Sequence, residues 1–323
     1  MNAKERVKFV VPGDMPIQIQ GSPHLERLKP YGDLTLYTDR PSSPEEQLER
    51  VKDADIMLNT RGAISWSGEA LSALPKLRMI TTCGVGTNNY DLEVATKMGI
   101  VISNQPKATS KFVAEHIFGL MMAASKRAAY QTSELKAGRW TKLDNIFLQG
   151  KTLGVIGTGN IGAEVVRLGG AIGMQVIAWT YNPTPERAAL LGVKFVELDD
   201  LIRQSDVISL NVRLSDESDK MIGERELAMM KQDSLLVNGG RAELVDTPAM
   251  INALNSGHLA GAAIDVFDKE PLPSDHPILA CEQVVLTPHI ADQTPEGIEA
   301  LNEGAVDNVI AFLEGRPQNV VTW

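Results

Sequence analysis

Three residues that could carry acid–base chemistry closely follow short apolar segments of the chain. They are Arg241, Glu270 and His289. A guanidinium can hold a carboxylate through two parallel hydrogen bonds, and an imidazole can give or take a proton near neutral pH. A carboxylate behind the imidazole fixes its orientation and favours its charged form. Each residue alone could be a surface arginine, a turn residue or a core histidine, but the three together favour a site for a carboxylate-bearing substrate.

The stretch 151–162 reads K-T-L-G-V-I-G-T-G-N-I-G, which predicts a strand, a glycine turn and a helix. Gly157 permits the tight turn, Gly159 lets a pyrophosphate approach the backbone, and Gly162 lets the helix pack close to the strand. The helix N-terminus would offer free N–H groups and a positive dipole end to the phosphates. The sequence therefore predicts a dinucleotide site.

More short apolar segments follow, and they are apolar almost throughout, as strands covered by helices on both faces should be. In a doubly wound sheet, ligands bind outside the carboxyl ends of the strands. We therefore expect Arg241, Glu270 and His289 to converge in one crevice beside the cofactor. The predicted strands lie at residues 175–179, 206–212, 234–238, 261–267 and 283–287.

The first part of the chain alternates short apolar strands with helices, which predicts a smaller open α/β domain. After residues 78–83, the turn Gly84-Val85-Gly86 could expose backbone N–H groups to an anion, or it could be a plain strand-to-helix turn. The predicted strands lie at residues 8–11, 34–37, 55–58, 78–83 and 100–103.

Two longer helices are predicted, at residues 110–129 and 295–314, each with one apolar face. Glu115 and His116 lie within the first of these helices. Such a pair on a helix face can be functional, but it is more often structural, and both interpretations stay open.

The 323-residue chain is 43% hydrophobic and 22% charged, as expected for a globular protein with two domains. Its net charge of −10 argues against nucleic acid as a partner. Cys83 and Cys281 lie far apart without metal-ligand spacing, so we expect no metal site and free thiols in a reducing cytosol. We see no signal peptide and no run of membrane-spanning length, so we expect a cytoplasmic protein without a membrane partner.

The ordered motifs resemble those of the D-isomer-specific 2-hydroxyacid dehydrogenase family, and the resemblance covers nearly the whole chain. V-I-G-T-G-N-I-G is similar to the family's cofactor fingerprint. The segments with the family's catalytic arginine, glutamate and histidine resemble V-N-G-G-R-A-E-L-V-D, G-H-L-A-G-A-A-I-D-V-F-D-K-E-P-L and T-P-H-I-A. The resemblance thus implies that Arg241, Glu270 and His289 are catalytic.

An enzymatic activity follows from the same resemblance. It implies an NAD(P)-dependent dehydrogenase similar to phosphoglycerate dehydrogenase or glyoxylate–hydroxypyruvate reductase. Such an oxidoreductase transfers a hydride between a nicotinamide cofactor, NAD or NADP, and a small 2-oxo or D-2-hydroxy acid, such as glyoxylate, hydroxypyruvate or a phosphoglycerate-like acid. The alternative is a dinucleotide-sensing regulatory protein on the same fold, because the family's corepressor relatives retain the same residues.

The architecture implied by the resemblance has two α/β domains. A Rossmann-type doubly wound parallel sheet would form the dinucleotide-binding domain at residues 104–293. A smaller flavodoxin-like α/β substrate domain would combine residues 1–103 with 294–323. The family further implies a homodimer.

More site residues follow from positions that match the family. Asp265 stands where the family contacts the nicotinamide carboxamide. Arg61 aligns with a position that in some members reaches the distal end of the substrate, although it could equally be a surface arginine. C-G-V-G-T-N-N-Y-D resembles the substrate-carboxylate loop, formed here by Gly84, Val85 and Gly86.

The chain departs from the family where the adenine ribose would bind. Thr180 stands where NAD-using members usually have an acidic residue. No carboxylate would repel a 2′-phosphate there, and Arg187 or Arg213 could attract one, so the choice between NAD and NADP is open. Asn211 and Arg213 replace the His and Pro that the family often has. The expected cofactor-binding residues are Gly157, Thr158, Gly159, Asn160, Ile161, Gly162, Thr180, Asn182, Asn211, Val212, Arg213, Gly239 and Asp265.

Overall fold

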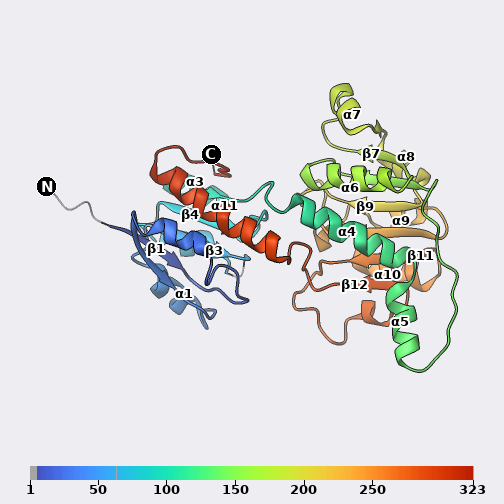
Figure 1. Cartoon of the computed structure of the whole chain (residues 1–323), viewed down its shortest axis with the longest axis horizontal. Helices are drawn as coiled ribbons and strands as arrows, with labels where there is room; N and C mark the ends of the chain where they lie inside the picture. Colours follow the sequence, from blue (N-terminus) through green and yellow to red (C-terminus); the bar gives the residue numbers. More distant parts are fainter. Residues whose placement is uncertain (1–5, 63, 323) are drawn as a thin grey trace. The chain divides into compact units, whose positions relative to one another are not determined.

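The structure, a computed structural model, describes residues 6–62 and 64–322. The chain divides into two compact units (Figure 1). One, here called the terminal unit, comprises the described residues up to Thr109 together with those from Gln293 onward. The other, the central unit, is Ser110–Asp292. Both ends of the chain therefore contribute to the same unit.

The central unit is built on a seven-stranded sheet in the order β12-β11-β10-β9-β6-β7-β8, with every neighbouring pair parallel. Counted from β6 as the first strand, this is the Rossmann order with β12 as an additional edge strand. The strands are β6 (Thr152–Ile156), β7 (Gln175–Trp179), β8 (Lys194–Phe195), β9 (Val207–Leu210), β10 (Ser234–Asn238), β11 (Leu259–Ile264) and β12 (Val284–Leu286).

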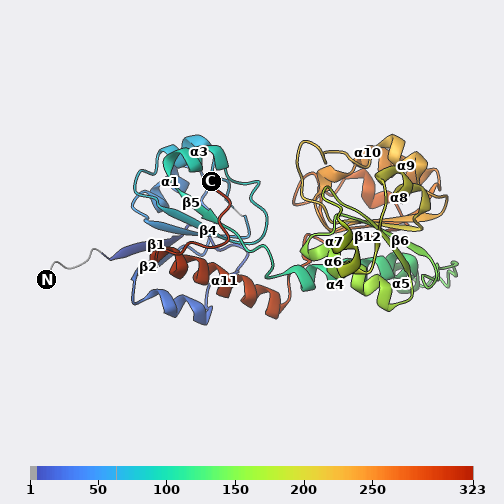
Figure 2. The same ribbon diagram turned by 90° about the horizontal axis from the view of Figure 1, so that it is seen from above.

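Helices cover both faces of this sheet. Successive side chains of a strand point to opposite faces, so each strand contributes to two separate apolar cores. Leu235 and Val237 of β10 belong to the core with α4 and α6, whereas Leu236 belongs to the core with α8, α9 and α10. Figure 2 shows these two helix layers on opposite sides of the sheet. The helices are α4 (Ser110–Ser125), α5 (Ala128–Lys136), α6 (Asn160–Ala171), α7 (Pro185–Leu191), α8 (Leu198–Gln204), α9 (Glu224–Met229) and α10 (Thr247–Asn255).

The terminal unit has a five-stranded parallel sheet in the order β2-β1-β3-β4-β5, which is the flavodoxin-like arrangement. Helices α1, α2 and α3 pack on one face, and α11 packs on the other with the 3₁₀ helix Pro23–Leu28. The elements are β1 (Val7–Val11), β2 (Gly32–Leu36), α1 (Pro44–Val51), β3 (Ile56–Thr60), α2 (Gly68–Ser72), β4 (Met79–Cys83), α3 (Leu92–Met98), β5 (Val101–Ser103) and α11 (Pro295–Leu313).

The predicted fold class, a Rossmann-type doubly wound sheet plus a smaller flavodoxin-like α/β unit, is confirmed. Two details of the prediction are wrong. The two-residue strand β8 was not predicted, because it is too short to show a periodic pattern. The helix predicted at residues 110–129 is in fact two helices, since Arg127 adopts a left-handed φ of 48° that ends the regular hydrogen bonding between α4 and α5.

Cys83 and Cys281 are both free and buried. Burial raises the pKa of the Cys83 thiol to about 12, so this thiol is protonated near neutral pH and is a poor nucleophile. Within the described part of the chain, no helix is long and apolar enough to cross a membrane.

Candidate active site

The turn that carries Arg241 is organised by the last residue of β10. Asn238 is buried, and its Nδ2 donates to the carbonyl of Arg241 at 2.7 Å, while its Oδ1 accepts from the amide of Gly240 at 3.1 Å. A Cβ on Gly239 would lie 2.7 Å from a side-chain atom of Ile117, so only glycine fits there without a shift. These contacts fix the direction in which the chain leaves the sheet at Arg241.

His289 and Glu270 form a pair at the ends of neighbouring strands. Nδ1 of His289 lies 2.8 Å from Oε2 of Glu270, whose Oε1 accepts from the amide of Phe267 at 3.1 Å. Because an ionised carboxylate only accepts hydrogen bonds, Nδ1 is assigned the hydrogen of the pair. Nε2 is then the nitrogen through which His289 can exchange a proton with a ligand.

The backbone of His289 is held from both sides by a buried carboxylate. His289 has a left-handed φ of 54°, a conformation that costs a non-glycine residue about 1–3 kcal/mol unless its surroundings enforce it. Asp265 is fully buried, and its two oxygens accept from the amides of Ile290 and Ala291, each at 3.1 Å. The hydroxyl of Thr287 also donates to Asp265, at 2.5 Å. The carboxylate therefore contacts the chain before and after His289.

His116 of α4 completes the surroundings of this carboxylate. Its Nε2 lies 3.0 Å from Oγ1 of Thr287 and 3.4 Å from Oδ1 of Asp265. Burial acts to raise the pKa of Asp265, but hydrogen bonds from His116, Thr287 and the Ile290 amide outweigh it, so this pKa lies below its ordinary value. Asp265 is thus ionised near neutral pH and acts only as an acceptor.

Arg241, Glu270 and His289 line one cavity of about 260 Å³ in the central unit. This volume lies just below the range of about 300–1,000 Å³ that is usual for small-molecule sites. Nη1 of Arg241 donates to the carbonyl of Gly240 at 2.8 Å. The remaining lining residues are Ala242, Glu243, Val266, Phe267 and Asp268. The cavity thus brings a guanidinium and a carboxylate-backed imidazole together.

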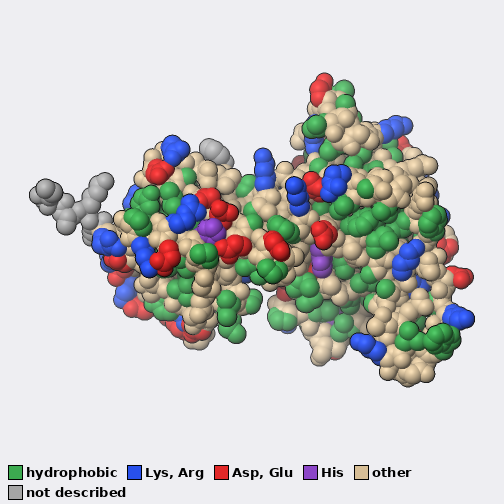
Figure 3. Space-filling model, viewed as in Figure 1, with side chains coloured by type: hydrophobic (Ala, Val, Ile, Leu, Met, Phe, Trp, Pro, Cys, Tyr) green, Lys and Arg blue, Asp and Glu red, His purple; other side chains and the backbone are tan. Residues whose placement is uncertain are grey.

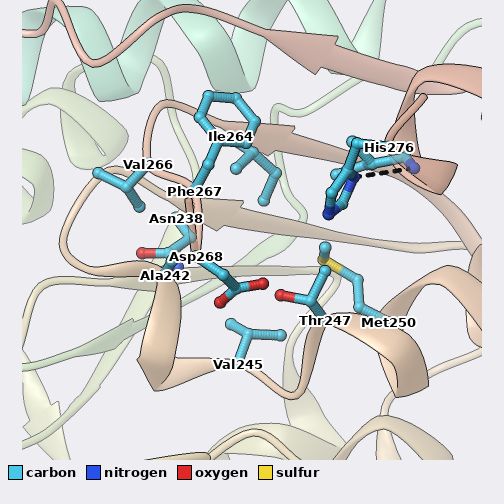
Figure 4. A pocket seen from close by; sticks show the side chains of 11 residues that line it. Asn238, Ala242, Val245, Thr247, Met250, Ile264, Val266, Phe267, Asp268 and His276 are labelled. Atoms are coloured by element: carbon cyan, nitrogen blue, oxygen red, sulfur yellow. Dashed lines mark hydrogen bonds between the residues drawn. The ribbon is translucent and has the colours of Figure 1, made fainter. Parts of the chain in front are cut away.

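A second hollow lies next to this cavity and shares several of its lining residues (Figure 4). Its walls are largely apolar, with contributions from Val245, Met250 and Ile264. Its volume of about 10 Å³ suits one water molecule at most. A substrate of several heavy atoms does not fit there, so the larger cavity is the candidate substrate site.

The glycine turn after β6 fits a bound pyrophosphate. Gly157 has a φ of 92°, and a Cβ on it would lie 2.7 Å from the backbone of Asn211 and Val212. A Cβ on Gly162 would lie 1.9 Å from the carbonyl oxygen of Gly157, so the helix can approach the turn only without a side chain. Gly159, the N-cap of α6, has no other atom within 4 Å of its would-be Cβ, which leaves the open space that a phosphate needs.

Beside this turn, Asn211 has a polar atom that suits a ligand. Its Nδ2 donates to the carbonyl and the hydroxyl of Ser209, whereas its Oδ1 is buried without a hydrogen-bond partner among the described residues. A buried acceptor of this kind is rarely left unsatisfied. The position of Asn211 next to Gly157 is therefore consistent with a bound dinucleotide.

Arg187 of α7 connects the glycine turn to the segment after β7. Its Nη2 donates to Oγ1 of Thr158 at 2.9 Å and to the carbonyl of the same residue at 3.1 Å, and its Nη1 donates to the carbonyl of Asn182. The described residues form no ion pair with Arg187. Thr180, at the end of β7, provides no carboxylate. Arg187 thus brings a positive charge next to the glycine turn, while Thr180 brings no negative charge to the end of β7.

In the terminal unit, the predicted substrate-binding residues follow β3 and β4. Arg61 has a left-handed φ of 55°, and its guanidinium faces the side-chain amide of Gln293, whose oxygen is assigned to this side because it then accepts from Nε at 3.0 Å. In the turn of Gly84, Val85 and Gly86, the first two carbonyls accept hydrogen bonds from the Gln105 amide at 2.8 Å and from the Asn104 side chain at 2.7 Å. The turn is therefore held through its carbonyl groups.

Comparison with known proteins decides the family. The family model described as "D-isomer specific 2-hydroxyacid dehydrogenase, NAD binding domain" matches residues 118–291. The glyoxylate reductase of Aeropyrum pernix is 37% identical over 308 residues, with 92% of each chain covered. The chain belongs to the D-isomer-specific 2-hydroxyacid dehydrogenases. The predicted family is thereby confirmed.

Further relatives of this 2-hydroxyacid dehydrogenase agree. The D-3-phosphoglycerate dehydrogenase of Methanocaldococcus jannaschii is 38% identical over 281 residues, which cover 86% of this chain and 53% of that protein. The structure of a glyoxylate reductase from Paecilomyes thermophila superimposes with a TM-score of 0.90 at 30% identity, and covers 98% of this chain and 99% of the other. The protein is thus a hydride-transferring oxidoreductase of 2-oxo and 2-hydroxy acids that uses a nicotinamide cofactor. The regulatory alternative finds no support among these relatives.

Several residues that support the candidate site of this dehydrogenase could not be identified from the sequence. Asn238 and Thr287 had no signal, because a strand-ending Asn or Thr is common and their partners are seen only in the fold. For His116, the sequence left both a functional and a structural interpretation open. The structure shows that its side chain contacts Thr287 and Asp265, which directly follow β12 and β11.

Proposed function

We propose that this dehydrogenase reduces a small 2-oxo acid, of the size of glyoxylate or hydroxypyruvate, to its D-2-hydroxy acid, with Arg241, Glu270 and His289 as the catalytic residues. The observation that carries the proposal is the single small cavity that all three line. The relatives named glyoxylate reductase support a substrate of this size. The cavity follows the carboxyl ends of β10, β11 and β12, where an α/β sheet binds its ligands.

Arg241 binds the substrate carboxylate. Its planar guanidinium can form two parallel hydrogen bonds with the two carboxylate oxygens, which fixes the plane of the substrate. In that orientation the ketone oxygen lies close to the positive charge, and its partial negative charge is stabilised as the carbonyl is reduced. Asn238 supports this step indirectly, because it holds the turn that carries Arg241.

His289 supplies the proton of the reduction. The bound nicotinamide supplies the hydride. The protonated imidazole gives its Nε2 proton to the ketone oxygen, which becomes the hydroxyl of the product, and the neutral ring then takes a proton from water. Glu270 stabilises the charged imidazole through Nδ1 and keeps the ring oriented, at a distance of 2.8 Å. In the oxidative direction the neutral ring accepts the same proton.

The two structural units have different roles in this proposal. Residues 104–293 form the dinucleotide-binding domain, and the glycine turn with Asn160 and Ile161 binds the pyrophosphate. Residues 1–103 and 294–323 form the substrate domain. Its anion-binding element is the turn of Gly84, Val85 and Gly86, and Arg61 contributes a charge toward a polar substrate tail. The match of the family's NAD-binding domain to residues 118–291 supports the first assignment.

Within the cofactor class, we propose weak discrimination or a preference for NADPH. Thr180 offers no negative charge against a 2′-phosphate, and Arg187 is a cation next to the glycine turn. Arg213, after β9, is a second candidate cation for the phosphate. Asn182 and Val212 line the same end of the sheet. An arginine at such a position favours the additional phosphate of NADPH.

We further propose a homodimer formed through an exposed apolar patch on α5 and the loop after it. Trp140 and Phe147 have exposed fractions of 80% and 68%, and Figure 3 shows hydrophobic side chains gathered over this segment. Glu134 pairs with Arg139 and accepts a hydrogen bond from Thr141 at 2.6 Å, and these bonds lower the pKa of Glu134 to about 2. The loop is thus fixed with Trp140 outward. The other members of the patch are Leu135 and Leu143.

We also propose a cytoplasmic location. The support is that Cys83 and Cys281 are free, since free thiols persist in reducing compartments. Fractionation of the producing cells, with an antibody against this chain, tests this proposal directly.

A turnover assay tests the proposed function. Glyoxylate, hydroxypyruvate and pyruvate are offered to the purified protein with NADH and with NADPH, and oxidation of the cofactor is followed at its absorbance band. Arg241→Ala should lower kcat/KM by roughly 10²-fold, and Arg241→Lys should recover only part of it because a lysine lacks the two-pronged geometry. Arg203→Ala, which removes an exposed arginine of α8, is the control and should leave kcat/KM unchanged. Absence of turnover with all three acids would refute the proposed substrate class.

A further inference from the structure

His116 is the first member of a hydrogen-bond chain that ends on the backbone around His289. The hydroxyl of Thr287 has one hydrogen, and it is donated to Asp265 at 2.5 Å. Nε2 of His116, 3.0 Å from the same hydroxyl oxygen, must therefore be the donor in that contact. The chain runs from His116 through Thr287 to Asp265, and the carboxylate then accepts from the amide of Ile290.

This chain of bonds bears on the orientation of a fully buried carboxylate. A buried charged group that loses one of its hydrogen bonds either turns toward another partner or is destabilised. The partners of Asp265 include the hydroxyl of Thr287 and the amides of Ile290 and Ala291, which lie on either side of His289 in the sequence. Any turn of the carboxylate therefore moves the loop that presents the imidazole.

The loop is sensitive to such movement because His289 adopts a left-handed φ of 54°, which non-glycine residues adopt only when their surroundings enforce it. The amide of His289 also donates a hydrogen bond to the carbonyl of Thr287 at 3.0 Å. The imidazole must reach Glu270 across this turn, with Nδ1 at 2.8 Å from the carboxylate. A displacement of the loop would break that pairing.

We propose that His116 and Thr287 are positioning residues for His289: through Asp265 they hold the loop in the conformation in which the imidazole meets Glu270. The inference rests on the proposed catalytic role of His289. Neither residue touches the substrate in this proposal, and both act through the loop.

His116 contributes both a hydrogen bond and packing, and the two contributions can be separated by the choice of variant. About 22% of its side chain is exposed, whereas Val113 and Ile117 of the same helix are buried in the core. Because most of this side chain is covered, the informative replacement is His116→Leu, which keeps an apolar side chain of similar size and removes the donor. A loss of activity without a loss of stability is the pattern that a positioning role predicts and a packing role does not.

Two matched pairs of variants test the proposal. Thr287→Val removes the hydroxyl but keeps the shape, and Thr287→Ser keeps the hydroxyl. His116→Leu removes the donor, and His116→Gln restores an N–H donor at a similar reach. For each variant, kcat and KM for reduction of glyoxylate and the Tm are measured.

We expect Thr287→Val and His116→Leu to lower kcat by roughly 10- to 100-fold, because displacement of a catalytic group by about 1 Å can cost that much. KM and the Tm should stay close to those of the wild type. Thr287→Ser should keep kcat within about threefold of the wild type, and His116→Gln should recover part of the loss. Unchanged kcat in both Thr287→Val and His116→Leu would overturn the proposal, as would an equal loss in Thr287→Ser and Thr287→Val.

A measurement without cofactor or substrate makes the test independent of turnover. The chain has five histidines, so ring ¹³C signals of labelled protein can be assigned, and the signal absent in His289→Gln identifies His289. This signal should shift in Thr287→Val and His116→Leu but not in Thr287→Ser. If the wild type is inactive yet the shift occurs, the proposed substrate fails and the positioning role stands. If the wild type is active and the signal does not shift, the positioning role fails alone.

Discussion

Nδ1 of His289 lies 2.8 Å from Oε2 of Glu270, although the two residues are carried by different segments that follow β11 and β12. The strands are parallel neighbours, with Ile264 paired to Leu286. Because parallel neighbours end at the same edge of a sheet, the chain places a carboxylate behind an imidazole although 19 residues separate the two. The pairing leaves Nε2 for proton transfer.

Cofactor preference should respond to the charge at the end of β7. Thr180→Asp should lower the ratio of kcat/KM with NADPH to that with NADH by at least about tenfold, because a carboxylate repels the 2′-phosphate. Arg187→Ala should lower the same ratio, whereas Arg167→Ala, which removes an exposed arginine of α6, should not. Steady-state kinetics with both cofactors measure these ratios. A wild-type preference for NADH above about a thousandfold would contradict the proposed role of Thr180.

Helix α6 should tolerate a methyl group at Gly170 but not at Gly162, which packs against the glycine turn. Gly162→Ala places a Cβ 1.9 Å from the carbonyl of Gly157, so the helix must shift. We expect a loss of about 1–3 kcal/mol in the free energy of unfolding in urea, and weaker cofactor binding. Gly170→Ala meets no atom within 4 Å and should stabilise the protein by about 0.5–1 kcal/mol. Equal stabilities of the two variants would show that the turn is looser than the structure indicates.

Arg61 should matter only for substrates with a polar or anionic tail. Arg61→Ala removes the charge that now contacts Gln293. KM should rise for hydroxypyruvate and for phosphorylated or dicarboxylic 2-oxo acids, and should stay unchanged for glyoxylate, which has no tail. Arg61→Lys, which keeps the charge, should lie between the wild type and Arg61→Ala. An unchanged KM for every acid that is turned over would eliminate this role of Arg61.

The apolar patch on α5 and the following loop should govern assembly. Replacing both Trp140 and Phe147 by Ser should convert a dimer into a monomer, because it removes the two most exposed aromatic side chains of the patch. Light scattering after size-exclusion chromatography gives the mass. Leu190→Ser is the control, since Leu190 is 85% exposed but lies on α7 away from this segment in the sequence. A wild-type protein that is already monomeric would refute the proposed homodimer.

Much of the fold could be predicted from the sequence because buried parallel strands are nearly continuous apolar runs. Segments such as 234–238 and 261–267 therefore marked β10 and β11 to within a few residues. The break at Arg127 could not be predicted, since the apolar pattern of α4 continues past it and the left-handed residue has no compositional signal. The two-residue strand β8 was missed for the related reason that periodicity needs length.

The candidate site could be predicted only for residues that follow the carboxyl ends of strands, where a doubly wound sheet binds its ligands. That rule pointed to Arg241, Glu270 and His289, which the structure places around one cavity. It could not reveal the contact between His116 and Thr287, which are 171 residues apart in the sequence. Such a contact depends on how α4 packs over the sheet. Supporting hydrogen bonds of this kind are determined by tertiary structure and have no motif.

Loss of His289 itself should separate catalysis from binding. His289→Ala should lower kcat for reduction by roughly 10²–10⁴-fold, the usual contribution of general acid–base catalysis. The cofactor Kd, measured by fluorescence titration, should not change, because the glycine turn is formed by other residues. A parallel loss of cofactor binding would indicate that the substitution disrupts the fold of the central unit.

The pH profile of Glu270→Gln tests the central claim most directly. Reduction requires a charged His289 and oxidation a neutral one, so the wild type should have the lower pH optimum in the reductive direction. Glu270→Gln removes the negative charge beside Nδ1 but keeps the shape, which disfavours the imidazolium. The falling limb of kcat/KM for reduction should therefore move to lower pH, while Glu243→Gln, which neutralises another carboxylate of the same cavity, should leave it in place. An unmoved limb in Glu270→Gln would contradict the assignment of Arg241, Glu270 and His289 as one catalytic set.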